Sequence, residues 1–190
     1  MSIEKQQINT KKLVITALFT ALTTISTIVI QIPLPFGYVN FGDVFVLLGA
    51  FLLGPIFGTI SASIGSALAD VIVGYAFYAP GTFIIKGTMA LVAGLISKSI
   101  RVKIKLKPIA LIIGGVVAEL IMATGYFFYE AVILSYSWAA TASIVGNLMQ
   151  GVIGVALSVT ITALLTSRKI PFLNFNEKQE KISDESKNNN

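Results

Sequence analysis

Five ionisable side chains lie within or at the ends of long apolar stretches of this sequence: Asp43, Asp70, Lys86, Glu119 and Glu130. A charge at the centre of a bilayer costs about 2.5–3.5 kcal/mol on insertion scales, so such residues usually face a bundle interior or a wet cavity. Lys86 has no acidic residue within one helical turn. Two interpretations of Lys86 stay open, an ion pair with Asp70 or direct contact with a ligand.

Amide and aromatic side chains extend this polar set. Asn147 and Gln150 are three residues apart and therefore share one helix face. Tyr126 and Glu130 follow Glu119 by seven and eleven residues, which again gives one face. Such faces suit a polar small molecule, with interhelical hydrogen bonding as the alternative. The predicted substrate-binding residues are Asn40, Asp43, Tyr78, Lys86, Glu119, Tyr126, Glu130, Trp138, Asn147 and Gln150.

Several of these residues also have a purely structural interpretation. Asp43 stands at a predicted helix start, where an aspartate is as well suited to capping the helix as to contacting a ligand. Glu130 can contact water at the headgroups, and most of the aromatic side chains can form an interfacial belt. Aromatic residues in the predicted outer loops can instead cover a cavity or stack on a flat ligand.

The chain contains no Cys and no His, which narrows its chemistry. Thiol nucleophiles, the usual zinc sites and His-based triads are all excluded. The string 81-GTFIIKGT-88 places Lys before Gly, the reverse of the order in a phosphate-binding P-loop. We predict no catalytic residue, no metal site and no intrinsic cofactor. An acid pair of Glu119 with Asp43 keeps an intramembrane enzyme open as one alternative.

The composition indicates an integral membrane protein of one domain. Of the 190 residues, 55% are hydrophobic and 12% are charged, and the mean hydropathy is +0.83. A soluble domain usually has about 25% charged residues. The formal net charge of +5 comes from local basic clusters without the aromatic interleaving of a nucleic-acid-binding surface.

The apolar runs predict six transmembrane helices. Pro55 after Gly54 divides one long run, because glycine suits a helix end and proline the first position of the next helix. We expect the first run to be a helix rather than a signal peptide, because no small-residue cleavage site follows it. The expected helices are 13–30, 43–54, 55–73, 81–97, 108–130 and 142–166. They make up a membrane domain over 13–167, which follows a polar segment at 1–12 and precedes a polar, disordered tail at 168–190.

The basic residues predict the orientation of these helices. With both termini in the cytoplasm, Lys5, Lys11, Lys12, the 98–107 loop and Arg168 with Lys169 all lie inside, and the outer loops contain no Lys or Arg. The polar intramembrane side chains then gather in the outer half of the bundle. We therefore expect an all-α membrane protein, a six-helix bundle with a cavity that opens outward and is closed at its base by apolar packing.

Four stretches together resemble a known family, the substrate-binding S components of energy-coupling factor (ECF) vitamin transporters. They are 39-VNFGDVFVLLGAFLLGPIFGTISASIGSALAD-70, 75-YAFYAPGTFIIKGTMALVAGLI-96, 118-AELIMATGYFFYEA-131 and 145-VGNLMQGVIG-154. The resemblance covers about residues 13–167 and is strongest to the branch for hydroxymethylpyrimidine and pyridoxine-type vitamins. It implies a vitamin site near the outer face, roofed by the loop after the first helix, in a multi-pass protein of the prokaryotic plasma membrane.

The resemblance also implies partners. An S component works with a transmembrane T component and two cytoplasmic ATPase subunits, which use the ATP, and it topples in the membrane during transport. The family's Ala-x-x-x-Ala motif, which contacts the T component, falls here on Ala17 and Ala21. A stand-alone secondary transporter or channel is the alternative function. We expect such a protein to carry polar residues through both membrane halves, or an inverted repeat, and neither is visible.

Overall fold

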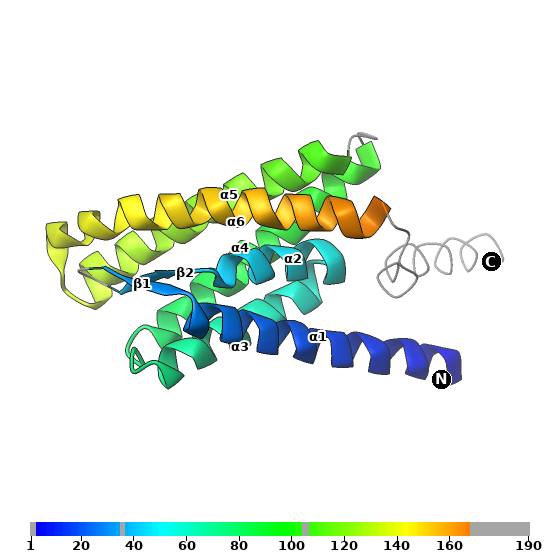
Figure 1. Cartoon of the computed structure of the whole chain (residues 1–190), viewed down its shortest axis with the longest axis horizontal. Coiled ribbons are helices and arrows are strands. Elements are labelled where there is room, and N and C mark those ends of the chain that lie inside the picture. Colours follow the sequence, from blue (N-terminus) through cyan, green and yellow to red (C-terminus); the bar gives the residue numbers. More distant parts are fainter. Residues whose placement is uncertain (1–2, 35–36, 104–106, 168–190) are drawn as a thin grey trace.

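The chain folds into a bundle of six α-helices with one short hairpin at its end (Figure 1). This computed structural model describes residues 3–34, 37–103 and 107–167. The described elements are α1 (Ile3–Val29), β1 (Gln31–Pro33), β2 (Tyr38–Asn40), α2 (Gly42–Leu53), α3 (Pro55–Ile72), α4 (Ala79–Lys103), α5 (Lys107–Phe128) and α6 (Thr141–Ser167). The predicted all-α class and six helices are confirmed.

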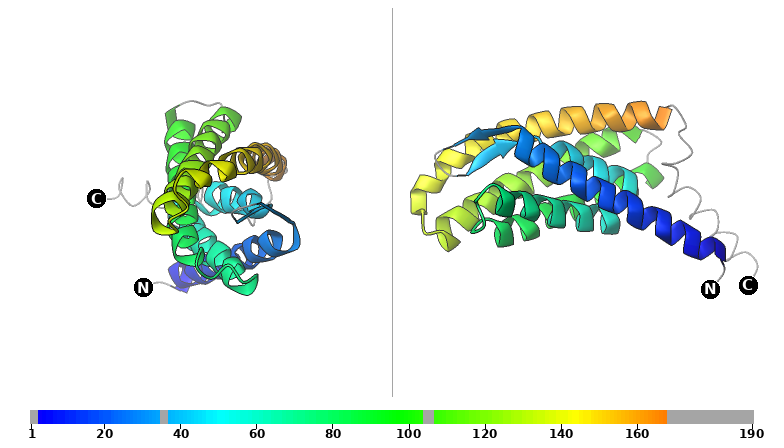
Figure 2. Two further views of the ribbon diagram at one scale, coloured as in Figure 1. Left: turned by 90° about the vertical axis from the view of Figure 1, so that its left-hand side faces the viewer. Right: turned by 60° about the horizontal axis from the view of Figure 1, so that its bottom comes forward.

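Helix α2 forms the centre of the bundle. It is apolar on every side, 11 of its residues are buried, and it packs against α1, α3, α4 and α6. Figure 2 (left) shows it between the other helices along the bundle axis. Its 12 residues span about 18 Å, which is too short for a hydrocarbon core of about 30 Å. The other five helices are long and apolar enough to cross a membrane.

The break between α2 and α3 lies where the sequence predicts it. Gly54 has φ +84°, a left-handed conformation that a residue with a side chain rarely adopts, and Pro55 takes the first position of α3. The turn lets α3 fold back along α2. Gly58 then allows a close approach, because a Cβ atom there would lie 2.7 Å from the Cα of Ala50.

The small-residue spacings of α3 serve packing inside the chain. Besides Gly58 against α2, Gly65 lies against α1, where a Cβ atom would stand 2.7 Å from the carbonyl oxygen of Thr20. These glycines therefore join helices of the same chain. On α1, by contrast, Ala17 and Ala21 are exposed at the bundle surface.

Three segments differ from the sequence-based expectation. Helix α1 begins at Ile3 and α4 continues to Lys103, so helix replaces part of the polar segment at 1–12 and of the basic loop at 98–107. The loop after α1 contains the antiparallel pair β1–β2, in which Ile32 stands opposite Val39. Its Leu34 packs against α6 at Gly146, where no side chain stands in the way. The predicted tail at 168–190 lies outside the described residues.

Helix α5 ends in an irregular segment. It passes into one π-helical turn, Tyr129–Ile133, and a 3₁₀ turn, Ser137–Ala140, leads into α6. A π turn holds one extra residue per turn, so it rotates Glu130 relative to a regular helix. This end of α5 lies beside the hairpin, and the described ends of the chain, Ile3 and Ser167, lie at the opposite end of the bundle (Figures 1 and 2). The predicted placement of both termini on one side is thus consistent with the fold.

Candidate ligand-binding site

A pocket of about 400 Å³, measured with its open mouth, lies between the hairpin and the ends of four helices. The hairpin covers one side, and α3, α4 with the preceding Tyr78, the end of α5 and α6 supply the walls. The lining residues are Leu34, Gly37, Tyr38, Asn40, Asp70, Tyr78, Thr82, Tyr126, Glu130, Asn147 and Gln150.

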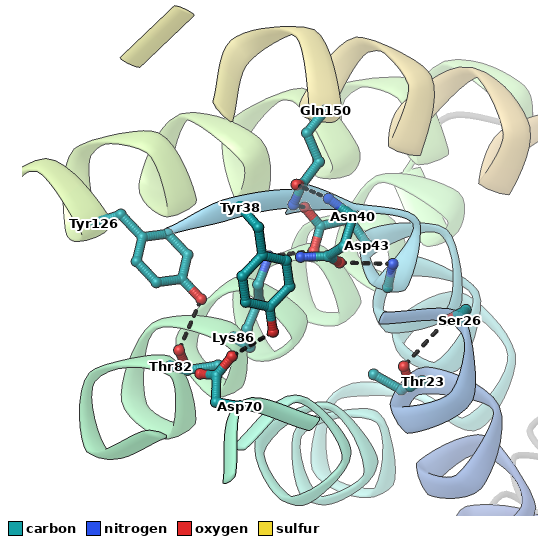
Figure 3. Close-up of polar contacts among 11 residues, drawn as sticks. Thr23, Ser26, Tyr38, Asn40, Asp43, Asp70, Thr82, Lys86, Tyr126 and Gln150 are labelled. Atoms are coloured by element: carbon teal, nitrogen blue, oxygen red, sulfur yellow. Dashed lines mark hydrogen bonds and ion pairs between the residues drawn. The ribbon is translucent and has the colours of Figure 1, made fainter. Parts of the chain in front are cut away.

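One polar wall of the pocket centres on Asp70. The hydroxyl of Tyr38 donates to Oδ1 of Asp70 at 2.6 Å, and the hydroxyl of Tyr126 donates to Oγ1 of Thr82 at 3.0 Å (Figure 3). Asp70 is 5% exposed, and its second oxygen, Oδ2, is buried without a hydrogen bond of ordinary geometry, with the Thr82 side chain as a neighbour that also acts on this carboxylate. A buried carboxylate oxygen without a donor is costly, so this wall favours a ligand that supplies an N–H or O–H group.

A second polar wall centres on Glu130. Its two carboxylate oxygens accept hydrogen bonds from the hydroxyls of Tyr78, at 3.1 Å, and Ser143, at 2.5 Å. Glu130 lies in the π turn that follows α5, and it is 2% exposed. This carboxylate therefore holds α4, α5 and α6 together at the pocket while one of its neighbours, Tyr78, lines the pocket wall.

The tyrosines outside the membrane spans stay hydroxyl donors. Burial raises the pKa of Tyr38 above its ordinary value of 10.0, and the charge of Asp70 acts in the same direction. Burial also raises the pKa of Tyr78, with Glu130 as the next cause. Both residues therefore keep their protons at neutral pH and donate to the carboxylates beside them.

Lys86 forms its ion pair with Asp43, and this corrects the predicted pairing with Asp70. Both side chains are almost fully buried, at 3% and 1% exposure, and the side-chain amide of Gln150 also donates to Asp43 (Figure 3). Asp70 has the Tyr38 hydroxyl instead. The α2 N-terminus has no side-chain cap hydrogen bond, so the capping interpretation of Asp43 is also wrong.

The Asp43 network reaches the pocket through one side chain. Oε1 of Gln150 accepts the backbone N–H of Asn40 at 2.7 Å, while its amide nitrogen binds Asp43. Gln150 thus connects the hairpin to the buried ion pair. Lys86 stands one helical turn beyond Thr82 along α4, so the ion pair lies behind the pocket wall and not in it.

Aromatic rings form the outer part of the site. Tyr75 packs against Tyr38 and Tyr78, with ring centroids 5.2 and 6.1 Å apart, and Tyr78 in turn packs against Tyr126 at 6.4 Å. Three of these rings line the pocket. The rings are tilted relative to one another, so they pack as an aromatic cluster beside the pocket.

The structure brings six of the ten predicted substrate-binding residues to the pocket wall, namely Asn40, Tyr78, Tyr126, Glu130, Asn147 and Gln150. Asp43 and Lys86 stand behind it. Glu119 lines a different groove, and Trp138 is 80% exposed, so the structure does not place either of them at the pocket.

Sequence reasoning missed several wall residues. Tyr38 was expected only as a loop aromatic, Asp70 only as an ion-pair partner, and Leu34, Gly37 and Thr82 were not expected at all. A signal for Thr82 exists, because it precedes Lys86 by four residues and therefore shares its helix face. Within the described part of the chain, no group of three or more His, Cys, Asp or Glu side chains is arranged to hold a metal ion.

Comparison with protein families gives one match that covers most of the chain. The sequence model of the family described as "ECF-type riboflavin transporter, S component" matches residues 7–167. A relative from Pyrococcus woesei, described as "Uncharacterized protein in gap 3'region", is 34% identical over 152 residues, which cover 79% of this chain and 98% of the relative. The hydroxymethylpyrimidine and pyridoxine branch expected from the sequence is not supported, because the matching family is the riboflavin type.

Two solved structures share the fold. One, titled "Structure and mechanism of the S component of a bacterial ECF transporter", has a TM-score of 0.68 at 21% identity and covers 85% of this chain and 99% of its own. The other, an S component for biotin from an ECF-type ABC transporter, has a TM-score of 0.55 at 18% identity and covers 86% and 95%. At these identities the likeness concerns the fold alone.

Proposed function

Since the chain belongs to the family of ECF-type riboflavin transporter S components, we propose that its pocket binds riboflavin for import across the membrane. The protein is a multi-pass membrane subunit that binds a vitamin substrate, and it is not an enzyme. The description of the family supports riboflavin over the smaller pyrimidine and pyridine vitamins. The chemistry of the pocket supports a ligand of the same kind.

The observation that carries this proposal is the free oxygen of Asp70 in an aromatic pocket. Riboflavin has a flat three-ring system with one ring N–H between two carbonyl groups, and a chain that carries hydroxyl groups. Oδ2 of Asp70 can accept from the N–H or from a hydroxyl, and Asn147 can donate to a carbonyl. The rings of Tyr78 and Tyr126 can stack on the ring system.

The ligand that accompanies the protein through purification tests this assignment. The protein is purified in detergent and denatured, and the small molecules that it releases are identified by mass spectrometry. We expect riboflavin or another flavin. A matched preparation with Asp70→Asn, checked for the same elution on size exclusion, should release less flavin. Recovery of hydroxymethylpyrimidine or a pyridoxine vitamin would reject riboflavin and restore the branch expected from the sequence.

We further propose that uptake requires partner subunits, namely a T component and two cytoplasmic ATPases. The resemblance assigns the T contact to Ala17 and Ala21, and both are exposed on α1. Vitamin uptake should therefore stop when the ATP-hydrolysing residues of the partner ATPases are inactivated. Uptake that survives this change, in a strain with no other coupling module, would favour a stand-alone transporter.

A further inference from the structure

Glu119 is a buried carboxyl group that the proposed function does not use. It is 6% exposed, and neither of its oxygens forms a hydrogen bond with a described residue. Helix α6 makes room for it with two glycines. A Cβ atom at Gly154 would lie 2.8 Å from Oε1 of Glu119, and one at Gly151 would lie 3.2 Å from Oε2. The side chain therefore points at α6 and fills the space that these glycines leave.

A second carboxylate stands next to Glu119. The same Cβ atom at Gly154 would lie 3.2 Å from Cβ of Asp43, so Asp43 and Glu119 approach one position of α6 from two helices. Asp43 already binds Lys86 and the amide of Gln150. If both carboxylates were ionised, they would share Lys86 as their cation among the described residues, and α6 itself carries no charged residue.

Glu119 also lines a groove on the membrane side of α5 and α6, although its two carboxyl oxygens are buried. This groove has a volume of about 1,050 Å³, measured with its open side, and lies between the spanning helices α5 and α6. The groove is otherwise lined almost entirely by apolar side chains, among them Ile112, Val116, Leu120, Leu148, Val152 and Val155. Hydrocarbon is the solvent at this depth, and it offers no donor to a carboxylate.

We propose that Glu119 carries an exchangeable proton and that the α5–α6 groove, under which its carboxyl oxygens are buried, is the route by which an apolar reagent reaches this acid from the bilayer. As a neutral acid, Glu119 is compatible with the apolar groove and can donate to Asp43. The charged groups that face it are Asp43 of α2 and Lys86 of α4. Loss of the proton would give Lys86 a second carboxylate partner, and this would compete with the Asp43–Gln150 network behind the pocket. This inference goes beyond the proposed function and does not depend on which vitamin is bound.

A hydrophobic carbodiimide tests the proposal on the unmodified protein. Dicyclohexylcarbodiimide reacts with a protonated carboxyl: the carboxyl oxygen adds to the central carbon and the proton goes to one nitrogen. The acyl group then moves from oxygen to nitrogen, which leaves a stable N-acylurea with no leaving group. We expect mass spectrometry to find this adduct on Glu119. A water-soluble carbodiimide, which does not enter the hydrocarbon, should leave Glu119 unlabelled.

Two comparisons make the result specific. Glu130 lies in the same membrane span, is also buried and has two hydroxyl donors, and it does not line the groove. It should remain unlabelled. Asp43→Asn frees Lys86 to pair with an ionised Glu119, so labelling should fall several-fold in that variant. An absence of adduct on Glu119, equal labelling of Glu130, or unchanged labelling in Asp43→Asn would each overturn the proposal.

Discussion

Lys86 shows how the surroundings of a side chain decide its role. It has three carboxyl groups within electrostatic reach, Asp43, Asp70 and Glu119, and only Asp43 forms the ion pair. The Tyr38 hydroxyl binds one oxygen of Asp70, and the other oxygen is buried without a hydrogen bond to any described residue. Lys86 therefore supports the site from behind, and Asp70 remains free for a ligand.

The buried ion pair should reveal itself in a double substitution. Lys86→Met leaves Asp43 as an uncompensated buried charge, and we expect it to reduce the free energy of unfolding by about 3–5 kcal/mol. Adding Asp43→Asn should restore most of that loss, because the unpaired charge is gone. Thermal unfolding in one detergent measures both variants. A double variant as unstable as Lys86→Met alone would contradict this role.

Thr82 should matter for binding, and Thr88 on the same helix provides its control. Thr82→Val removes the acceptor of the Tyr126 hydroxyl at the pocket wall, so riboflavin affinity should fall about tenfold, or ~1.4 kcal/mol. Thr88 is exposed and bonds only to its own helix at Ile84, so Thr88→Val should leave affinity unchanged. Equal effects of the two substitutions, measured by flavin fluorescence quenching, would remove Thr82 from the site.

The sequence could predict the buried polar residues, because a charged side chain in an apolar membrane segment usually faces the bundle interior or a water-filled cavity. Asn147 and Gln150 share a face at the pocket as predicted. The partner of Lys86 could not be predicted, since Asp43 and Asp70 both lie near the outer end and only the rotation of α2, α3 and α4 decides between them. Glu119 faces α6 and the groove for the same reason.

At the scale of elements, α2 determines the arrangement of the bundle. It is too short to span the membrane, and its burial by four neighbours lets Asp43, at its first turn, meet side chains of α4 and α6. The hairpin that precedes it covers the pocket. The ion pair and the pocket wall thus depend on where this one helix begins.

Gly58→Ala tests the close contact of α2 with α3. The new methyl group would lie 2.7 Å from Cα of Ala50, a backbone atom that cannot rotate away, so the helices must separate. We expect a loss of about 1–3 kcal/mol in the free energy of unfolding. Leu68→Ala, on the exposed face of α3, should cost less. If the Gly58→Ala variant unfolds at the same temperature as the wild type, the close contact at Gly58 does not contribute to stability as proposed.

The helices were predictable at this scale because long apolar runs and the Gly54–Pro55 break leave clear signals. The hairpin was not, since each strand has three residues and β1 ends in a proline. The π turn at Tyr129–Ile133 was not predictable either. One extra residue in a helical turn changes the direction of every following side chain without any change in composition.

At the scale of the whole molecule, the polar residues concentrate near the hairpin end, and α1 presents small residues to the membrane. The positive-inside pattern places the hairpin end outside, and the fold puts the described ends of the chain at the other end (Figure 1). We therefore propose that one molecule combines a site near the outer face with an α1 surface for a partner helix.

The partner surface should be separable from the pocket. Leucines in place of both Ala17 and Ala21 should block the close approach of another helix, so copurification with the T component and vitamin uptake should be lost. Riboflavin binding by the isolated protein should remain. Val29→Leu, at an exposed position nearer the end of α1, is the control and should keep both activities. Normal copurification of the double leucine variant would place the contact elsewhere.

The most direct test of the central claim is a riboflavin titration of the purified protein, followed by quenching of flavin fluorescence. The account predicts saturable quenching that excess pyridoxine or hydroxymethylpyrimidine does not reverse. Asp70→Asn should weaken this binding by about tenfold or more, because hydrogen bonds to a charged group contribute about 1.5–3 kcal/mol. An absence of riboflavin binding, or its displacement by pyridoxine, would contradict the account.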